Sequence, residues 1–344
     1  MKKFPLLSLC LCVSVVNFSG CATKNEARVV LYCSVDEVYA KPLIKKLEAK
    51  TGLKIDALFD TEATKTAGLA NRIRAERGRP RCDVFWSSAL LQTLLMSDEG
   101  VLETYDSPAA RDLPARFRGR DWVSVGARAR VVMASGSTFK TKSAVDLADY
   151  PANVIGKMPA VAFSNPQFGT ASDWVTALTQ RKGSQKVLAM FVKFKENEAG
   201  VLPGNGDVAR AVADCSVSGC GLYYGISDSD DYLAQKREKK PVSLFQTVKD
   251  NVLVPGAVSI LKGAPNPENA KKLLDAIASE EGERALTSQM PGVFSLRGLD
   301  KKSNFQSGGV DFSFLMNAPR DDYSKWAKAW REIREPLHQI FASK

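Results

Sequence analysis

Residues 215–234 read CSVSGCGLYYGISDSDDYLA, and their change from apolar to acidic side chains decides how the rest of the chain is interpreted. The apolar run 222–226 predicts a buried strand, and the serines and aspartates at 227–231 predict a turn that caps the next helix. Ligands of open α/β sheets bind at such strand ends. Carboxylate and phenol oxygens suit a hard cation, so Asp228 and Asp230 are candidate ligands. The alternative is that the aspartates only cap and the tyrosines only pack.

Outward from this stretch, three strands nearer the N-terminus also end in polar turns. Apolar runs at 28–34, 53–59 and 82–86 each precede a helical pattern, which predicts a parallel sheet. Turns at one edge of such a sheet converge on one crevice, although Ser, Thr and Asp are also common helix caps. The candidate ligand-binding residues at this and later strand ends are Ser34, Asp36, Tyr39, Thr61, Glu62, Thr64, Trp86, Ser87, Ser88, Arg128, Thr170, Ala171, Asn205, Ser227 and Asp228.

A chain of 344 residues exceeds what one hydrophobic core usually holds, so two lobes are expected. Two extended segments, 123–133 and 251–261, are predicted to cross between the lobes. A long helix is predicted at 265–286, and Trp326 and Trp330 lie on the apolar face of a C-terminal helix. The expected division is a leader at 1–21, a tether at 22–27, lobe 1 at 28–130 plus 250–290, lobe 2 at 131–249, and C-terminal helices packing on the lobes at 291–344.

The N-terminus has the pattern of an export signal. Two basic residues, Lys2 and Lys3, precede an apolar stretch at 4–18, which is too short for a membrane span. The tetrapeptide Phe18-Ser19-Gly20-Cys21 resembles a bacterial lipobox, with Phe in place of the usual Leu. It implies lipidation of Cys21 and anchoring on the outer side of a membrane. The alternative is ordinary cleavage that leaves Cys21 free.

Charge and composition exclude several function classes. The formal charge is +10, and removal of Lys2 and Lys3 leaves +8, but the basic residues are scattered and the export signal argues against nucleic-acid binding. With His338 as the only histidine, a histidine zinc cluster and a Ser-His-Asp triad are excluded. No Cys-x-x-Cys pair occurs. Cys215 and Cys220 are close enough along the chain for a local disulfide in an exported protein.

The chain resembles bacterial ABC-transporter solute-binding proteins related to ferric-ion binders. The segments that carry the resemblance are VLYCS (30–34), AKTGL (49–53), DTEATKT (60–66), CDVFW (82–86), EGVL (99–102), GARAR (126–130), NGDV (205–208) and the region from Pro255-Gly256 to 267–270. The resemblance implies a type II periplasmic binding fold, in which two α/β lobes joined by two crossing strands close on one ligand by a hinge motion. It implies no enzyme activity, and it implies a permease and an ATPase as partners and a monomeric chain.

Ferric binders of this type use adjacent tyrosines just past a strand of the second lobe. The pair Tyr223-Tyr224 matches in residue type, but by strand register the family's pair corresponds to positions nearer 228–230. Asp36 and Ser88 stand where the family has a histidine and an acid in the first lobe. The resemblance further makes Arg128 an anion contact and Asn205 a polar contact, as residue-by-residue matches to the family's pattern.

Two ligand classes remain open. Ferric iron would be cargo, bound with a synergistic anion by oxygens of Tyr39, Tyr223, Tyr224, Asp228 and Asp230, since hard cations favour anionic oxygen. The alternative is a phosphorylated or carboxylated metabolite held by Arg128, Thr64, Ser88, Thr170 and backbone N–H groups. No resident cofactor is expected. An exported hydrolase would need a nucleophile and base at a spacing that the sequence does not show, and a purely structural surface protein would not explain the polar strand ends.

Overall fold

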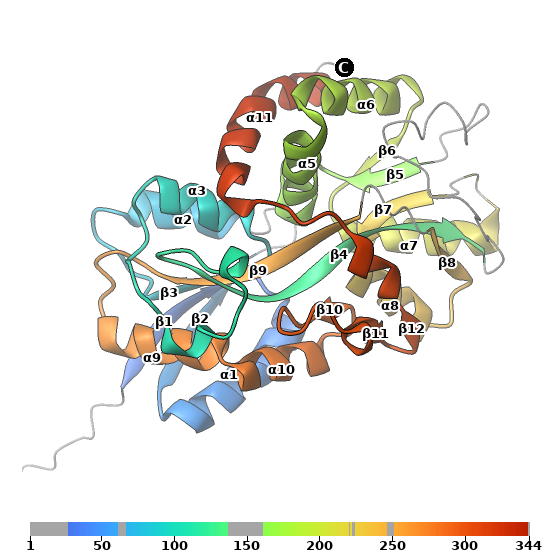
Figure 1. Ribbon diagram of the computed structural model, residues 1–344. Helices are drawn as coiled ribbons and strands as arrows, with labels where there is room; N and C mark the ends of the chain where they lie inside the picture. Colours follow the sequence, from blue (N-terminus) through green and yellow to red (C-terminus); the bar gives the residue numbers. More distant parts are fainter. Residues whose placement is uncertain are drawn as a thin grey trace, which may run out of the picture.

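The computed structural model describes residues 27–60, 67–136, 161–219, 221, 224–245 and 251–342, and within them one ten-stranded mixed sheet runs through the molecule. Its strand order is β2-β1-β3-β9-β4-β7-β5-β6, with β8 and β10 also paired to β4 (Figure 1). The strands are β1 (Arg28–Cys33), β2 (Lys54–Phe59), β3 (Val84–Ser87), β4 (Val123–Ser135), β5 (Val161–Ser164), β6 (Gly200–Leu202), β7 (Tyr224–Asp228), β8 (Val242–Phe245), β9 (Val252–Ile260) and β10 (Val293–Phe294).

The first half of the sheet is built from strand–helix units. Strand β1 pairs in parallel with β2 and β3, and the helices α1 (Glu37–Thr51), α2 (Ala67–Glu76) and α3 (Leu91–Asp98) follow these strands. Apolar residues on one face of each helix cover the sheet; Leu43 and Leu47 of α1 and Ile73 of α2 are buried. The apolar runs at 28–34, 53–59 and 82–86 are therefore strands, and each is followed by a helix, as expected.

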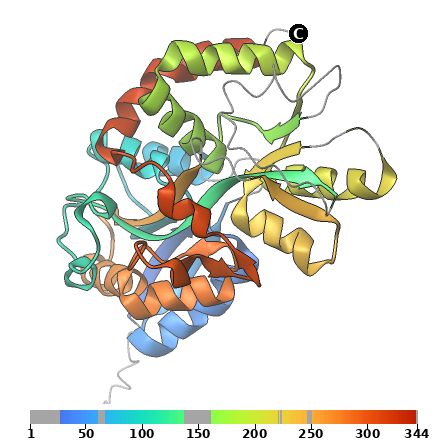
Figure 2. The ribbon, with the colours of Figure 1, turned by 45° about the vertical axis from the view of Figure 1, so that its right-hand side comes forward.

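Strands β4 and β9 connect the two halves. They run antiparallel to each other, and β9 also pairs with β3 whereas β4 pairs with β7 (Figures 1 and 2). The register of the β4–β9 pair shifts between Ser124 and Ala127, where Gly126 has a left-handed backbone with φ of 63°. A bulge of this kind bends a strand and increases its twist. The two extended segments predicted to cross between lobes correspond to these strands.

The second half repeats the strand–helix pattern around β7. This strand is parallel to β5, which in turn is parallel to β6. The helices of this half are α5 (Gly169–Lys182), α6 (Ser184–Glu196), α7 (Asn205–Ser218) and α8 (Ser229–Arg237). Phe163 of β5 packs against Phe191 and Phe194 of α6, with ring centroids 5.6 and 5.3 Å away. The strand β7 leads directly into α8.

The helix predicted at 265–286 is two helices, so that prediction is wrong. Helix α9 (Pro267–Ala278) ends at Ser279, whose backbone is extended, and α10 (Glu280–Gln289) begins there. The Ser279 hydroxyl accepts the Gly282 N–H at 3.1 Å. A Cβ on Gly282 would lie 2.3 Å from the Ala276 carbonyl oxygen, so this tight corner needs a glycine.

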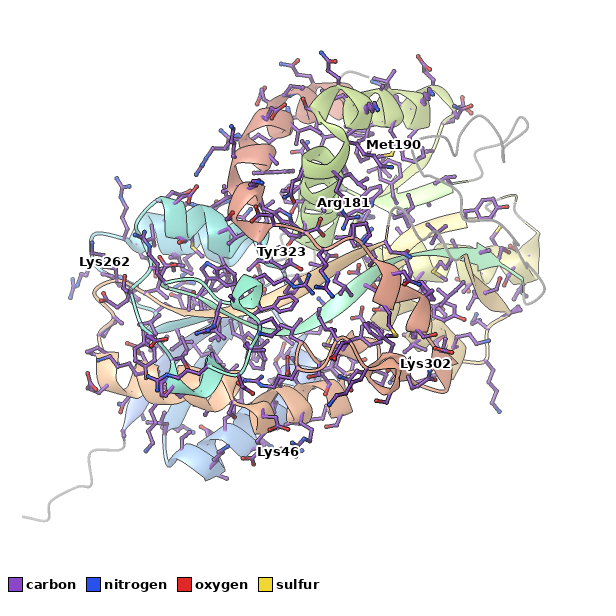
Figure 3. All side chains as sticks on the ribbon, viewed as in Figure 1. Lys46, Arg181, Met190, Lys262, Lys302 and Tyr323 are labelled. Atoms are coloured by element: carbon purple, nitrogen blue, oxygen red, sulfur yellow. The ribbon has the colours of Figure 1, made fainter. Side chains whose placement is uncertain are left out.

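The C-terminal residues pack on both halves. A hairpin of β11 (Gln306–Ser307) and β12 (Val310–Asp311) and several short 3₁₀ turns precede α11 (Trp326–Ala342). The side chains of Trp326, Trp330, Ile333 and Leu337 are buried, so this face packs into the core, as expected. The preceding segment is held by Arg181, whose guanidinium contacts Asp321 at 2.6 Å; Figure 3 labels Arg181 and nearby Tyr323.

The cysteines divide by location. Cys33 and Cys82 are buried free thiols, and burial raises the pKa of Cys33 to about 12. Cys215 is disulfide-bonded and lies in the last turn of α7, which extends to Ser218, rather than at the start of a turn-like loop. Cys220 and Cys21 lie outside the described residues. No helix among the described residues is both long and apolar enough to cross a membrane.

Candidate ligand-binding cleft

A polar cleft lies where the carboxyl ends of strands from both halves meet. Its volume is about 520 Å³, including the open mouth. The first half contributes residues after β1 and β3, and the second half contributes residues after β5, β6 and β7. The lining residues are Asp36, Ser88, Arg128, Ser164, Asn165, Phe168, Gly169, Thr170, Pro203, Gly204, Asn205, Gly206, Asp228, Asp230 and Asp231. The predicted residues Asp36, Ser88, Arg128 and Asp228 thus face one gap.

Arg128 bridges the two halves across this cleft. It is on β4, and its Nε donates to Asp230 Oδ2 at 2.8 Å, while Nη2 reaches Asp36 Oδ2 at 3.5 Å. Its Nη1 donates to the backbone oxygen of Ser88 at 3.4 Å. Burial works to lower the pKa of Arg128, but the carboxylates of Asp230 and Asp36 raise it well above its ordinary value, so the guanidinium stays charged.

Arg130, two residues further along β4, forms a buried hydrogen-bond network. Its Nη1 donates to Asp228 Oδ1 at 2.7 Å and to Asn205 Oδ1 at 2.8 Å. The other carboxylate oxygen of Asp228 accepts the Thr170 hydroxyl at 2.5 Å and the Asn205 amide at 3.0 Å. Asp228 therefore does not use its side chain to cap α8, contrary to the prediction for this turn, because Arg130 directly opposite on β4 takes it.

Three carboxylates gather on the second half of the cleft. One oxygen from each of Asp228, Asp230 and Asp231 lies within 4.8 Å of the others. Asp231 accepts the hydroxyl of Ser227 at 3.3 Å, and Asp230 holds Arg128. These oxygens are of the type that a hard cation prefers, but carboxylates also accept hydrogen bonds from hydroxyl groups.

Four helices begin at the cleft: α1 after Asp36, α5 at Gly169, α7 at Asn205 and α8 after Asp228. The N-cap residue Phe168 of α5 makes no side-chain cap, whereas at α7 the Asp207 carboxylate accepts the N–H of Gly204 at 3.0 Å, and the N–H groups of residues 205–207 remain as donors. Each helix start carries roughly half a positive charge and free N–H donors, which favour an anionic group. The cleft therefore offers donors beside its carboxylate acceptors.

Several predicted site residues lie elsewhere, and their assignment to the cleft is corrected. Tyr224 starts β7 and packs in the core, four residues or roughly 13 Å from Asp228 at the cleft end of the strand. Trp86 is buried in β3, and the Ser87 hydroxyl donates a hydrogen bond to the carbonyl of Ala89 in the turn after this strand. Ser227 is buried and donates to the Asn205 carbonyl at 2.8 Å. None of these four residues lines the cleft, although Ser227 contacts the lining residues Asn205 and Asp231.

Other candidates are near the cleft without lining it, or lie outside the described residues. Ser34 is buried, and its hydroxyl accepts the N–H of Ser88 at 2.9 Å, so it shapes the turn. Tyr39 accepts a hydrogen bond from Arg237 of α8 at 3.1 Å, a contact between the two halves. Ala171 is buried in the first turn of α5. The candidates outside the described residues are Thr61, Glu62, Thr64 and Tyr223.

The sequence candidates did not include Arg130, which binds the lining residue Asp228, nor eight of the lining residues themselves: Ser164, Asn165, Phe168, Gly169, Pro203, Gly204, Gly206 and Asp231. Arg130 carries a usable signal, because it follows Arg128 by two residues and side chains two apart project from the same face of a strand. Ser164 and Asn165 end β5 in the same way as the turns that were recognised. Asp231 belongs to the acidic turn itself.

The fold is that of periplasmic binding proteins, and the sequence has ferric-binding relatives. Iron-bound HitA from Pseudomonas aeruginosa superposes with a TM-score of 0.77 at 18% identity, covering 92% of this chain and 99% of that one. AfuA from Actinobacillus pleuropneumoniae, with fructose-6-phosphate bound, superposes with a TM-score of 0.66 at 21% identity, covering 90% of this chain and 99% of that one. The major ferric iron-binding protein of Neisseria gonorrhoeae is 24% identical over 283 residues, 78% of this chain and 80% of that protein.

These superpositions confirm the predicted two-lobe type II fold. Residues 29–289 match the family of bacterial extracellular solute-binding proteins, so most of the chain is covered by the match. That family consists of solute-binding components of transport and not of enzymes, which confirms the expectation of no catalytic activity. The chain belongs to the bacterial extracellular solute-binding proteins.

Proposed function

We propose that this protein captures a small solute that carries an oxyanion, phosphate or carboxylate, next to hydroxyl groups. The observation that carries the proposal is the mixture of donors and acceptors in one cleft. Arg128 and the first turns of α5 and α7 offer N–H groups, and Asp36, Asp230 and Asp231 offer carboxylate oxygens. A hydroxylated phosphate ester presents the complementary groups.

The charges of the cleft support a ligand with groups of both kinds. The four aspartates that line the cleft leave a net charge of −2 after Arg128 and the adjacent Arg130 are counted. Four helix starts at roughly +0.5 each offset this charge. The carboxylates would repel a ligand that carries only an anionic group, whereas hydroxyl groups beside that anionic group can donate hydrogen bonds to the carboxylates. AfuA, one of the similar structures, binds such a sugar phosphate.

Ferric iron is the second candidate. The three carboxylates within 4.8 Å of each other favour it, and so do the ferric binders among the relatives. Against it, no tyrosine lines the cleft among the residues that the structure describes, since Tyr224 is in the core. The predicted phenolate ligation with a synergistic anion would therefore depend on Tyr223 and on carboxylates.

The ligand class is tested by binding to the chain from residue 22 onward. A panel of inorganic phosphate, hexose 6-phosphates and dicarboxylates is compared with ferric citrate by thermal unfolding. A true ligand at 100 times its Kd raises the free energy of unfolding by about 2.7 kcal/mol. Stabilisation by a phosphate ester without a visible iron band supports the proposal. A tyrosinate-to-iron band that Tyr223→Phe abolishes, with no response to the esters, would establish iron instead.

A matched pair of variants locates the anion. Arg128→Lys keeps the positive charge but loses the planar fork, and we expect at least roughly tenfold weaker binding of the ester. Arg284→Lys makes the same change in a surface pair with Glu280 on α10, where the Arg284 side chain is 70% exposed, and should leave the affinity unchanged. Equal affinities in the two variants would show that Arg128 does not contact the ligand.

We further propose that the chain is a lipoprotein anchored through Cys21 on the periplasmic side of a membrane, where it delivers its solute to the permease and ATPase of an ABC importer. Membership of the solute-binding family supports the transport partners. In the native host, Cys21→Ser should move the protein from the membrane to the soluble fraction. Continued membrane association of that variant would refute the anchor without affecting the proposed ligand.

A further inference from the structure

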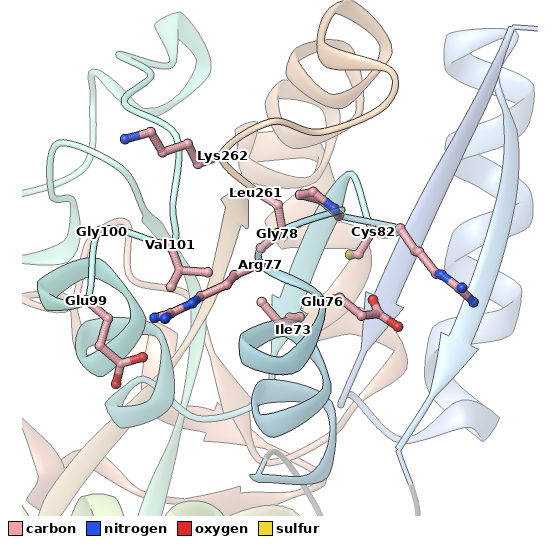
Figure 4. Close-up of a pocket in the computed structure, with 12 residues that line it drawn as sticks. Ile73, Glu76, Arg77, Gly78, Cys82, Glu99, Gly100, Val101, Leu261 and Lys262 are labelled. Atoms are coloured by element: carbon pink, nitrogen blue, oxygen red, sulfur yellow. The ribbon is translucent and has the colours of Figure 1, made fainter.

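A second cavity lies on the opposite end of the first half from the ligand cleft. Its volume is about 770 Å³, including its open mouth, and it is formed by the end of α2, the loop before β3, the segment after α3 and the turn after β9 (Figure 4). Ser88 at the carboxyl end of β3 lines the cleft, whereas Cys82, just before the start of β3, lines this cavity. The two sites therefore occupy opposite edges of the sheet.

The cavity has an apolar floor and basic side chains at its rim. Buried Ile73, Val101 and Leu261 line it, and exposed Arg77, Arg81 and Lys262 stand at its rim, as Figure 4 shows for Arg77 and Lys262.

Its two acidic residues are engaged elsewhere. Glu76 accepts the Tyr32 hydroxyl at 3.0 Å and the Arg72 Nε at 2.9 Å, and Glu99 is held by Arg74 at 2.7 Å. Among the described residues, no acidic side chain forms an ion pair with the three rim cations of the cavity.

The chain enters the fold beside this cavity. The backbone N–H of Asp83, next to Cys82, donates to the carbonyl of Val30 at 2.9 Å, and the amide of Asn269 donates to the carbonyl of Arg28 at 2.8 Å. The proposed anchor, Cys21, is seven residues before Arg28. Seven extended residues span at most about 25 Å, so a lipid on Cys21 keeps the bilayer surface within about 25 Å of Arg28, which is at the same end of the parallel strands β1 and β3 as the cavity.

We propose that the face around this cavity, with Arg77, Arg81 and Lys262 at its centre, docks on anionic phospholipid. Basic residues within a Debye length of an anionic leaflet are attracted to it. Docking of this edge turns the ligand cleft, at the other end of β3, away from the bilayer, where free solute arrives. The proposal concerns the orientation of the anchored protein and does not depend on the identity of the solute.

The test is sedimentation of the chain from residue 22 onward, which carries no lipid, with phosphatidylglycerol or phosphatidylcholine vesicles at low salt. We expect binding to the anionic vesicles only, with loss at high salt. The triple variant Arg77→Glu/Arg81→Glu/Lys262→Glu should bind at least roughly tenfold more weakly. All three positions are exposed, so the thermal midpoint should be retained.

The matched control is Lys186→Glu/Lys193→Glu/Lys328→Glu. These residues are exposed on α6 and α11, and Figure 3 shows Met190 of α6 far from Lys262. The control has the same net charge as the first variant and should keep most of the binding. Equal losses in both triples would show that only net charge matters and would overturn the proposal. Absence of vesicle binding, with thermal stabilisation by glycerol 3-phosphate, would overturn it in favour of a soluble anion site.

Discussion

Arg128 and Arg130 show how two like residues on one strand face acquire different tasks. Arg128 contacts Asp36 and Asp230 across the gap between the halves, whereas Arg130 is enclosed with Asp228, Thr170 and Asn205. The Arg130 side chain is 1% exposed and that of Asp228 is 3% exposed. A buried ion pair of this kind needs both partners, because a single charge left in the interior is costly.

Replacement of Arg130 should therefore destabilise the fold. We expect Arg130→Met to lower the free energy of unfolding by roughly 3–5 kcal/mol, since Asp228 would stay buried without its cation. Urea unfolding followed by circular dichroism measures this change. The double variant Arg130→Met/Asp228→Asn should recover a large part of the loss. Arg210→Met, which breaks the exposed pair with Asp207, should change the value by less than about 1 kcal/mol; a similar loss in both single variants would contradict this account.

At the scale of elements, α3 is capped by a residue from the other half of the chain. Oδ1 of Asp173, on α5, accepts the N–H groups of Leu90 and Leu91 at 2.8 and 3.1 Å. Burial raises the pKa of Asp173 to about 8, although these two hydrogen bonds act to lower it. The carboxyl group is then protonated in the folded chain at pH values where the unfolded chain has lost the proton.

The pH dependence of stability follows from that difference. Between pH 4 and pH 8 the folded state binds one more proton at Asp173 than the unfolded state, so this group makes stability fall as pH rises, by up to about 1.4 kcal/mol per pH unit. Its contribution is fully present below pH 4 and is lost as pH passes through 8. Asp173→Asn keeps an acceptor for the α3 cap and should flatten the urea-unfolding profile over this range. An unchanged slope would mean that Asp173 is ionised in the folded protein.

The end of α7 gives a second prediction at this scale. Of the seven cysteines, Cys10, Cys12 and Cys21 precede residue 22, which leaves four in the shortened chain. Cys33 and Cys82 are free and Cys215 is disulfide-bonded, so we expect a local bridge from Cys215 to Cys220. Thiol titration in denaturant should find two thiols before reduction and four after it. Cys220→Ser should give three thiols in both conditions, and a count of four in the unreduced parent chain would exclude the bridge.

For the whole molecule, the strand β4 connects the two halves and bends at Gly126. The N–H of Gly126 donates to the buried carboxylate of Glu283 at 3.0 Å, and a Cβ on Gly126 would lie 2.8 Å from the side chain of Val293. At Gly126 the strand β4 therefore contacts both α10, through Glu283, and β10, through Val293.

A substitution at this bend should affect the whole chain. Gly126→Ala combines a left-handed backbone with a steric clash, and we expect a loss of roughly 2–4 kcal/mol in the free energy of unfolding. Gly52→Ala is the matched control, because Gly52 has a similar φ of 67° at the end of α1 but open space around its Cα. It should cost only about 1–2 kcal/mol. Equal losses, measured by urea unfolding, would show that packing around Gly126 contributes nothing.

The sequence alone determined the two-lobe α/β class and the crossing strands, because hydrophobic periodicity and helix caps are local patterns. It also indicated that polar strand ends share one edge of the sheet, which brought Asp36, Ser88, Arg128 and Asp228 to one cleft. The break at Ser279 was missed because the amphipathic pattern continues through it, and only the close approach of Gly282 to Ala276 shows the corner.

Only the tertiary structure decided which side chains are engaged within the protein and which line the cleft. The pairing of Arg130 with Asp228, 98 residues apart, depends on the register of β4 against β7, which no local pattern encodes. The same register places Tyr224 at the buried start of β7 and Asp230 at the cleft. Strand ends can be predicted from short stretches of sequence, but the partner of each buried polar group is set by how distant strands align.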